Sequence, residues 1–341
     1  MKNIFGRLKF TESLGIFGLT LIAGAFLIDL IQGKNNGFGS LQMGSVGVGT
    51  FLVLLSWAAH NKKVLFYLGS ILNVLTAVFF IFGAMLVLIN VSGLFISLRK
   101  PTVNEGINFL GKFSKPVYSA SDVVKLEDRR PDETMQDYVY RLTHLVNKAT
   151  IQLPDERQKY PQFKLSVPIY ENYFFWLFNY LDPQSYGYYQ YCDSSKAIER
   201  AVTTCGQATR IVKDILLKNG LKARRVTLDG HIIVEVQLDK KTRTWWVLDP
   251  LFDIVLEHDM TTLSKQPDLV ADALKKAGYS DDVAVMYAAM FTPSGNYVIT
   301  EENYCKVEQK YYFYKWAFPL LLLMPFGVGK IVLQKRVAKP S

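Results

Sequence analysis

The chain has few cysteines, only three among 341 residues. A disulfide-rich scaffold needs a much higher density, so cross-links are not the main source of stability. Half of the residues are apolar, and 39 Lys plus Arg stand against 30 Asp plus Glu. A disordered chain has fewer apolar residues and relatively more charge. The composition therefore excludes both classes.

Charge is scarce in residues 14–98 and 316–333, whereas 99–315 has the mixed composition of an aqueous domain. A bilayer core about 30 Å thick requires about 20 apolar residues of helix. We therefore expect an integral membrane protein whose partner is the lipid bilayer. About four transmembrane helices are expected, over residues 14–31, 41–59, 64–97 and 316–333.

Two of these expected spans have alternatives. Ala23-Gly24-Ala25 resembles a signal-peptidase site, but the apolar run continues through Ile31, which favours an uncleaved anchor. As a helix, the run 64–97 would be roughly 50 Å long. One span with a helical extension fits this length, and a hairpin around Gly83 with two short arms is the alternative.

Basic residues of the short flanks set the expected orientation. They precede the first span, separate the second from the third, and follow the last. With four spans these clusters share the cytoplasmic face with both termini, which places residues 99–315 outside the cytoplasm. Arg99 and Lys100 argue mildly against this orientation. Much of the net charge of +9 lies in these flanks, and 99–315 lacks a basic stripe interleaved with stacking aromatics, so no nucleic-acid partner is expected.

Three domains follow from this pattern. Residues 1–98 form a membrane domain with three spans, 99–315 an extracytoplasmic domain, and 316–341 a last span with a basic tail. Residues 99–131 resemble a linker with little regular structure. A helix is expected from Asp132 or Glu133, with apolar residues at helical period. His144 lies on its solvated face, which argues against a catalytic role.

The segment 170–191 is exceptionally aromatic and predicts a short helix that ends at Asp182-Pro183. One interpretation is core packing and contact with a membrane interface, where Tyr and Trp are favoured. The other is that Tyr186 to Tyr191 line a substrate groove.

A helix with a cysteine in its first turn is predicted after Thr204. Thr203 or Thr204 can act as the N-cap, and Asn219-Gly220 ends the helix. A lone cysteine on a buried helix face is usually inert. The start of a helix, however, carries partial positive charge and free N–H groups, which stabilise a thiolate and can bind a developing oxyanion. Cys205 is therefore a candidate nucleophile.

Three strands are expected next, over 222–228, 231–238 and 243–249, and 251–257 is a candidate fourth. His231 opens the second strand after an Asp-Gly turn, and Asp249 ends the third. A loop with an odd number of residues between these strands places His231 directly opposite Asp249 on one face, whereas an even loop separates them. We expect the direct pairing. Helices are expected near residues 268–276, 282–290 and 301–316.

These residues together resemble the transglutaminase-like superfamily of papain-type cysteine enzymes. The similarity covers about residues 195–256. It rests on the Cys205 helix with Ala208, the LLKNGLKARRV segment, His231 on a strand and the WVLDP ending. The resemblance implies an α+β fold in which the helix carrying the cysteine packs on an antiparallel sheet.

The resemblance also implies roles for three residues. Cys205 would be the nucleophile, His231 the base and later the acid, and Asp249 the residue that orients the imidazole. Thr203 stands where the family often has Gly, and Gly206 where eukaryotic transglutaminases have Trp, which weakens the case for protein crosslinking. No metal or organic cofactor is implied. A side chain among residues 188–191 is a candidate for the second oxyanion donor.

We therefore expect a membrane-anchored peptidase, deamidase or transamidase that acts on a cell-envelope peptide or protein. The alternative is an inactive assembly or binding protein, since this fold is also used without catalysis. Cys192 and Cys305 either form a disulfide, leaving Cys205 as a reactive thiol, or are two unpaired structural cysteines.

Overall fold

The computed structural model describes residues 62–153, 160, 162–239, 241, 243–292, 296–299 and 302–337. The chain divides into two compact units, which are Met1–Gly93 with Tyr311–Ser341, and Leu94–Lys310. The first two expected spans, 14–31 and 41–59, lie outside the described residues.

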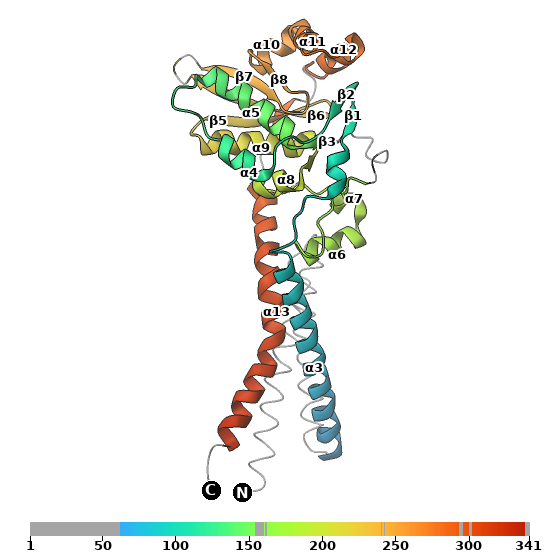
Figure 1. Ribbon diagram of the computed structural model, residues 1–341. Coiled ribbons are helices and arrows are strands. Elements are labelled where there is room, and N and C mark those ends of the chain that lie inside the picture. The colour runs from blue at the N-terminus through green and yellow to red at the C-terminus, as the bar shows by residue number, and fades with distance from the viewer. Residues whose placement is uncertain are drawn as a thin grey trace. The chain divides into compact units, whose positions relative to one another are not determined.

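Helix α3 (Lys62–Ser92) belongs to the first unit and is continuous through Gly83 (Figure 1). The hairpin alternative therefore does not form. Gly83 faces helix α13 (Glu302–Val337), where an added Cβ would come within 3.0 Å of Leu322 Cβ and of the Pro319 carbonyl oxygen. The missing side chain allows the two helices to approach closely.

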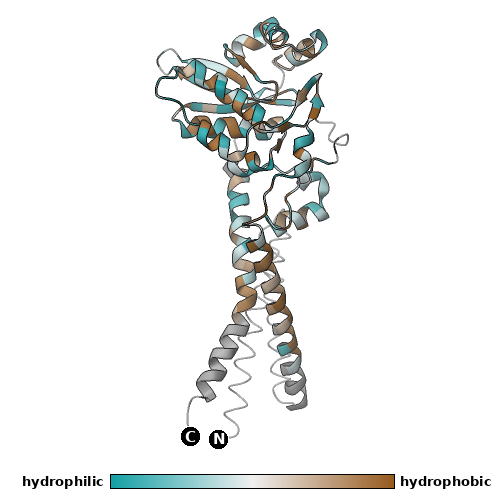
Figure 2. Cartoon of the chain, viewed as in Figure 1, coloured by the Kyte–Doolittle hydropathy of each residue, from teal (hydrophilic) through white to brown (hydrophobic). Residues whose placement is uncertain are grey.

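Apolar residues dominate α3 (Figure 2). Within the described residues, only Asn73–Ser92 is long and apolar enough to cross a membrane. The described residues thus contain one candidate span, and two of the four spans that the sequence predicts lie outside them. The expected span over 316–333 lies inside α13 but does not meet the same criterion over its described part.

The second unit is a mixed α+β structure built on an antiparallel sheet with the strand order β8-β7-β6-β5-β9. Gly230, with φ of 73°, completes the two-residue turn between β5 and β6. The sequence predicts strands β5 to β8 of this sheet but misses the edge strand β9. The strands are β5 (Lys222–Leu228), β6 (His231–Asp239), β7 (Thr244–Asp249), β8 (Ile254–Leu256) and β9 (Tyr297–Val298).

Helix α9 (Cys205–Lys218) packs against β5 and β6. Its end is a Schellman motif, because the N–H groups of Gly220 and Leu221 bond to the carbonyls of Leu217 and Leu216. One face of the helix is apolar and faces the sheet, as the helical period predicts. Its buried apolar residues are Ala208, Ile211, Val212, Ile215 and Leu216.

Helix α5 (Met135–Ala149) begins after the N-cap Thr134, whose hydroxyl accepts the N–H of Asp137. This start lies beyond the expected Asp132 or Glu133. The helix packs against α9, β7 and β8, and its apolar stripe is buried. His144 is exposed, as expected, and its Nδ1 lies 2.8 Å from Asp253 Oδ2.

The segment 99–131 contains more regular structure than the expected linker. Leu110 and Gly111 both have positive φ, 47° and 82°, and form the two-residue turn of a hairpin. A capping box of Ser119 and Asp122 starts the following helix. The elements are η1 (Pro101–Glu105), β1 (Ile107–Phe109), β2 (Lys112–Ser114) and α4 (Ala120–Leu126).

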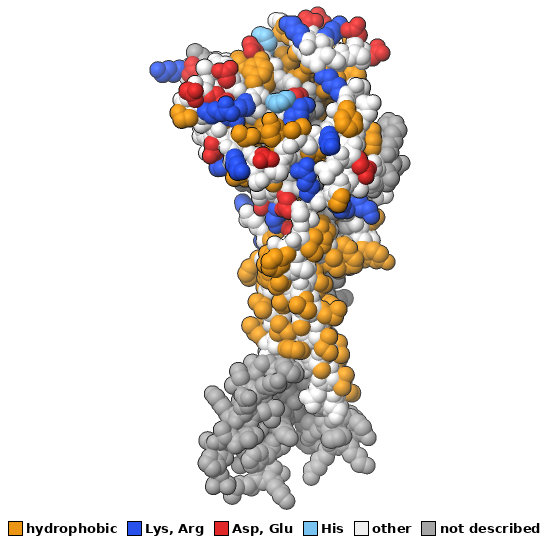
Figure 3. All heavy atoms as spheres, in the orientation of Figure 1, with side chains coloured by type: hydrophobic (Ala, Val, Ile, Leu, Met, Phe, Trp, Pro, Cys, Tyr) orange, Lys and Arg blue, Asp and Glu red, His pale blue; other side chains and the backbone are white. Residues whose placement is uncertain are grey.

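The remaining elements surround this sheet and helix pair. Strand β3 (Ile151–Gln152) pairs in parallel with β4 (Val202–Thr203), immediately before α9. Acidic and basic side chains are interspersed over the face of this unit shown in Figure 3. The other helices are α6 (Tyr173–Leu181), α7 (Pro183–Tyr186), α8 (Ser194–Arg200), α10 (Met260–Lys265), α11 (Pro267–Lys276) and α12 (Asp281–Ala289).

Candidate active site

Cys205 is the first residue of α9, as the sequence predicts, and its side chain is a half-buried free thiol. The N-cap Thr204 is extended and makes no side-chain capping bond. The first turn of this helix therefore keeps N–H groups that an anion can use.

Two side chains hold this turn, Thr209 of the same helix and Arg225 of the sheet. The Thr209 hydroxyl donates to the carbonyl of Cys205 at 2.8 Å. The buried Arg225 of β5 donates from Nη2 to the carbonyl of Gly206 at 2.8 Å and from Nε to Thr209 Oγ1 at 3.2 Å. Charge-assisted bonds of this kind are stronger than neutral ones. The backbone around the thiol is thus held from the side of β5.

His231 and Asp249 meet in the interior of the second unit. His231 Nε2 lies 2.6 Å from Asp249 Oδ2, and the two side chains are 5% and 0% exposed. A buried carboxylate is costly without compensating partners. The imidazole supplies one such partner directly.

The expected direct pairing of these two residues is wrong, because the register between β6 and β7 is offset from it by two residues. The register Val234↔Leu248 places Asp249 opposite Ile233, two residues along from His231. Because side chains alternate with a period of two, both residues still share one face. They meet diagonally across the ladder, a separation within reach of long side chains.

A β-bulge preserves this shared face. Asp239 pairs with Thr244, which encloses an even loop and would by itself put the two residues on opposite faces. The register then shifts, because Gln237 pairs with Trp245 and leaves Leu238 as an extra residue. The bulge therefore cancels the effect of the even loop.

The Asp249 carboxylate accepts four hydrogen bonds. Oδ1 accepts the N–H groups of Leu251 at 2.8 Å and Phe252 at 3.4 Å. Oδ2 accepts from His231 and from the hydroxyl of Tyr287 on α12. A carboxylate has about four lone-pair sites, so none is left for a proton. His231 is consequently protonated at Nε2, and its Nδ1 is the nitrogen that can exchange a proton with the thiol.

The groups around His231 determine its pKa. Burial by itself lowers the pKa of His231, but the charge of Asp249, their hydrogen bond and the interactions with Cys205 outweigh it and raise the pKa to about 10. The imidazole thus favours its charged form.

Gln190 contacts the first turn of α9. A Cβ on Gly206 would lie 2.7 Å from Gln190 Nε2, and this nitrogen is 3.5 Å from Thr204 Oγ1. The residues on both sides of Cys205 therefore contact the Gln190 side chain. Gly206 leaves the space that this amide occupies.

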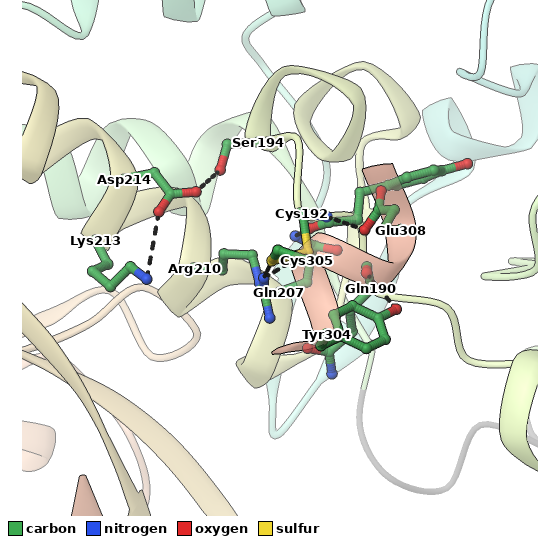
Figure 4. The surroundings of a disulfide bond; sticks show 11 residues. Gln190, Cys192, Ser194, Gln207, Arg210, Lys213, Asp214, Tyr304, Cys305 and Glu308 are labelled. Carbon is green, nitrogen blue, oxygen red and sulfur yellow. Dashed lines mark hydrogen bonds and ion pairs between the residues drawn. A yellow bond between two sulfur atoms is a disulfide. The ribbon is translucent and has the colours of Figure 1, made fainter. Parts of the chain in front are cut away.

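The loop that carries Gln190 is fastened to α9 and α13 (Figure 4). The Tyr304 hydroxyl donates to the Gln190 carbonyl at 3.0 Å, and Glu308 accepts the N–H of Cys192 at 2.8 Å. On the α9 side, Gln207 donates to the Tyr191 carbonyl at 2.9 Å. This loop is positioned by side chains from two helices.

Cys192 and Cys305 form a disulfide, which decides between the two alternatives for these cysteines. The guanidinium of Arg210 on α9 lies 3.1 Å from one sulfur and 2.9 Å from the other. Cys205 is the remaining free cysteine. The bond ties the Gln190 loop covalently to the start of α13.

The tyrosines of the aromatic segment before this disulfide differ in burial. Tyr189 and Tyr191 are buried, and Tyr189 packs on Phe175 with ring centroids 4.7 Å apart. Tyr188 is exposed. The core-packing interpretation is therefore correct for Tyr189 and Tyr191, while a substrate groove over 186–191 stays a prediction.

No protein-family model, curated protein or solved structure matches the chain. Among the described residues, no cluster of three or more His, Cys, Asp or Glu side chains is arranged to bind a metal ion. The structure brings Cys205, His231 and Asp249 to one site. Sequence reasoning missed Tyr287 and Arg225, because neither has a local pattern that distinguishes it from a core or surface residue.

The disulfide yields a first prediction. Replacing both cysteines, Cys192→Ser with Cys305→Ser, should lower the thermal midpoint of the full chain in detergent, because loss of a native cross-link commonly costs about 2–5 kcal/mol. Cys205→Ser, which removes the free thiol, is the matched control and should change the midpoint little. Peptide mapping without reduction should recover residues 192 and 305 linked, and free thiols at both positions would contradict the assignment.

A second prediction concerns Glu308. Burial raises the pKa of this carboxyl to about 7, although the Cys192 N–H and the charge of Arg210 lower it. The protonated form is therefore favoured by folding. This contribution is fully present below the ordinary value of 4.5 and is lost as the pH rises through about 7.

Glu308→Gln keeps an acceptor for Cys192 and cannot ionise. Thermal midpoints at pH 5 and pH 7.5 should show wild type losing stability relative to this variant as the pH rises. The exposed Glu105→Gln is the control and should follow wild type at both values. A constant difference between wild type and Glu308→Gln would contradict the prediction.

Proposed function

We propose that this protein is a membrane-anchored cysteine enzyme that transfers or hydrolyses an acyl group of a cell-envelope peptide or protein. The observation that carries the proposal is the buried His231–Asp249 hydrogen bond, together with the interaction of Cys205 with the same imidazole. A thiol, an imidazole base and an orienting carboxylate are the parts of nucleophilic acyl transfer. The resemblance of residues 195–256 to transglutaminase-like proteins points the same way.

The first half of the reaction forms a thioester. In the charged imidazole, Nδ1 of His231 already holds the proton that the Cys205 thiol gives up, and the thiolate attacks the acyl carbon, forming a C–S bond and an oxyanion. The backbone N–H of Cys205 and Nε2–H of Gln190 are the proposed oxyanion donors. The oxyanion then collapses, the bond to the leaving amine breaks, and the imidazolium returns its proton to that amine.

The second half releases the acyl group. Nδ1 removes a proton from water or from an acceptor amine as it attacks the thioester carbon. Collapse of the second oxyanion breaks the C–S bond, and the imidazolium protonates the departing thiolate. The products are an acid or a new amide, and the enzyme returns to its starting state.

The proposed location rests on two observations. Asn73–Ser92 is long and apolar enough to span a bilayer, and the sequence predicts further spans on either side of the second unit. The Cys192–Cys305 disulfide supports an oxidising compartment outside the cytoplasm. The proposed substrate class, a peptide or protein of the cell envelope, follows from that location.

A third prediction tests the nucleophile. The full chain in detergent should be labelled by a thiol-reactive acyl ester, and Cys205→Ala should abolish the labelling. His231→Gln should reduce the rate on the order of a hundredfold or more, because it removes the general base. Intact-mass spectrometry after timed exposure measures each rate.

The exposed His144→Gln is the matched control for the imidazole and should label like wild type. Equal labelling of wild type and Cys205→Ala would remove the support for an enzyme. Full retention of biological function by Cys205→Ala would favour the inactive assembly or binding protein.

A fourth prediction tests the Gln190 amide. Gln190→Ala should slow acylation about 100-fold, the usual effect of losing one oxyanion donor, while alkylation by iodoacetamide stays near wild type because it forms no oxyanion. Gln162→Ala, at an exposed glutamine, is the control. A parallel fall of both rates in Gln190→Ala would show a general loss of thiol reactivity instead.

A further inference from the structure

Tyr287 is a buried titratable side chain that the proposed reaction does not use. It lies on α12, is 0% exposed, and donates its hydroxyl to Asp249 Oδ2. This is the oxygen that His231 Nε2 also contacts at 2.6 Å. One carboxylate oxygen is thus shared between a phenol and the imidazole.

The ring of Tyr287 also contacts the imidazole. The two ring centroids are 5.5 Å apart, and Phe252 packs on Tyr287 with centroids at 4.4 Å. The titratable groups that face His231 are Asp249 of β7, Cys205 of α9 and Tyr287 of α12. Tyr287 is therefore placed to act on both members of the hydrogen bond.

Tyr279 provides an internal comparison. It is a nearly buried tyrosine whose ring packs on the same Phe252, with centroids 5.4 Å apart. Its hydroxyl donates to the Phe252 carbonyl at 3.1 Å and makes no bond with Asp249. The two tyrosines share packing but differ in the acceptor of the phenol.

We propose that Tyr287 is a positioning residue that fixes which lone pair of Asp249 Oδ2 meets His231 and moderates how strongly this carboxylate retains the imidazolium proton. This inference rests on the proposed function. A donor to Oδ2 spreads the negative charge of that oxygen and weakens its attraction for the imidazolium. The proton is then released more readily to a leaving amine.

The phenol remains a donor throughout the working range. Burial raises the pKa of Tyr287 well above its ordinary value, and the charge of Asp249 and their hydrogen bond raise it further. The hydroxyl therefore stays protonated when the imidazole titrates.

The test compares Tyr287→Phe with Tyr279→Phe in the full chain in detergent. Both variants keep a buried ring and lose one hydroxyl. The chain has only four histidines, so ¹⁵N-histidine NMR can follow the His231 ring, assigned by its loss in His231→Gln. We expect Tyr287→Phe to raise the titration midpoint of His231 by about one pH unit, a tenfold increase in proton affinity. Tyr279→Phe should leave it in place.

A second variant keeps the proposal testable if Tyr287→Phe does not fold. 3,5-Difluorotyrosine at position 287 keeps the shape and strengthens the donor, so the His231 midpoint should move to lower pH. Shifts of opposite sign in the two variants support the proposal. No shift, a shift shared by Tyr279→Phe, or a shift opposite to the expected sign in either variant overturns it.

The readout is independent of catalysis. If Cys205 fails to label as predicted but the midpoint shifts occur, the proposed enzyme function fails while the coupling of Tyr287 to His231 stands. If labelling occurs and the midpoint does not move, Tyr287 is only a packing residue. With both intact, Tyr287→Phe should also lower kcat for acyl transfer and leave KM unchanged.

Discussion

The buried carboxylate of Asp249 is the constraint on which this part of the fold depends. An ionised side chain with no exposed surface is stable only when its oxygens are satisfied. Its donors come from β6, from the backbone that follows β7 and from α12. Satisfying one charge therefore brings together the sheet, the turn into β8 and a helix distant in sequence.

The elements around the site follow from local sequence signals. The Gly220 ending and the Asp-Gly turn each act through their nearest neighbours in the chain. The sequence consequently predicts α9 and the three central strands to within about one residue. The expected linker over 99–131 fails, because its turn and capping residues build a short hairpin and a helix there.

The contacts between elements are harder to predict from the sequence than the elements themselves. A strand pattern reveals neither the even loop after Asp239 nor the extra residue at Leu238, and together these set the register of His231 and Asp249 two residues from the direct pairing. Tyr287 has the same appearance as any aromatic residue on a buried helix face. Its role depends on the packing of α12, which no pattern around Asp249 indicates. No pattern in the aromatic segment 170–191 indicates that Gln190 contacts the first turn of α9.

The distribution of donors explains which parts of the site can react. Both oxygens of Asp249 are fully engaged, and Nε2 of His231 is engaged with one of them. Proton transfer is thereby confined to Nδ1 on the side of the thiol. The carbonyls of Cys205 and Gly206 are bound by Thr209 and Arg225, and the N–H groups of Gln207 and Ala208 donate to Thr204, so the donors of this turn that can serve a ligand are the N–H groups of Cys205 and Gly206. One mobile proton, one thiol and free N–H donors are the features that the proposed acyl transfer needs, because its acyl carbon becomes tetrahedral and negative.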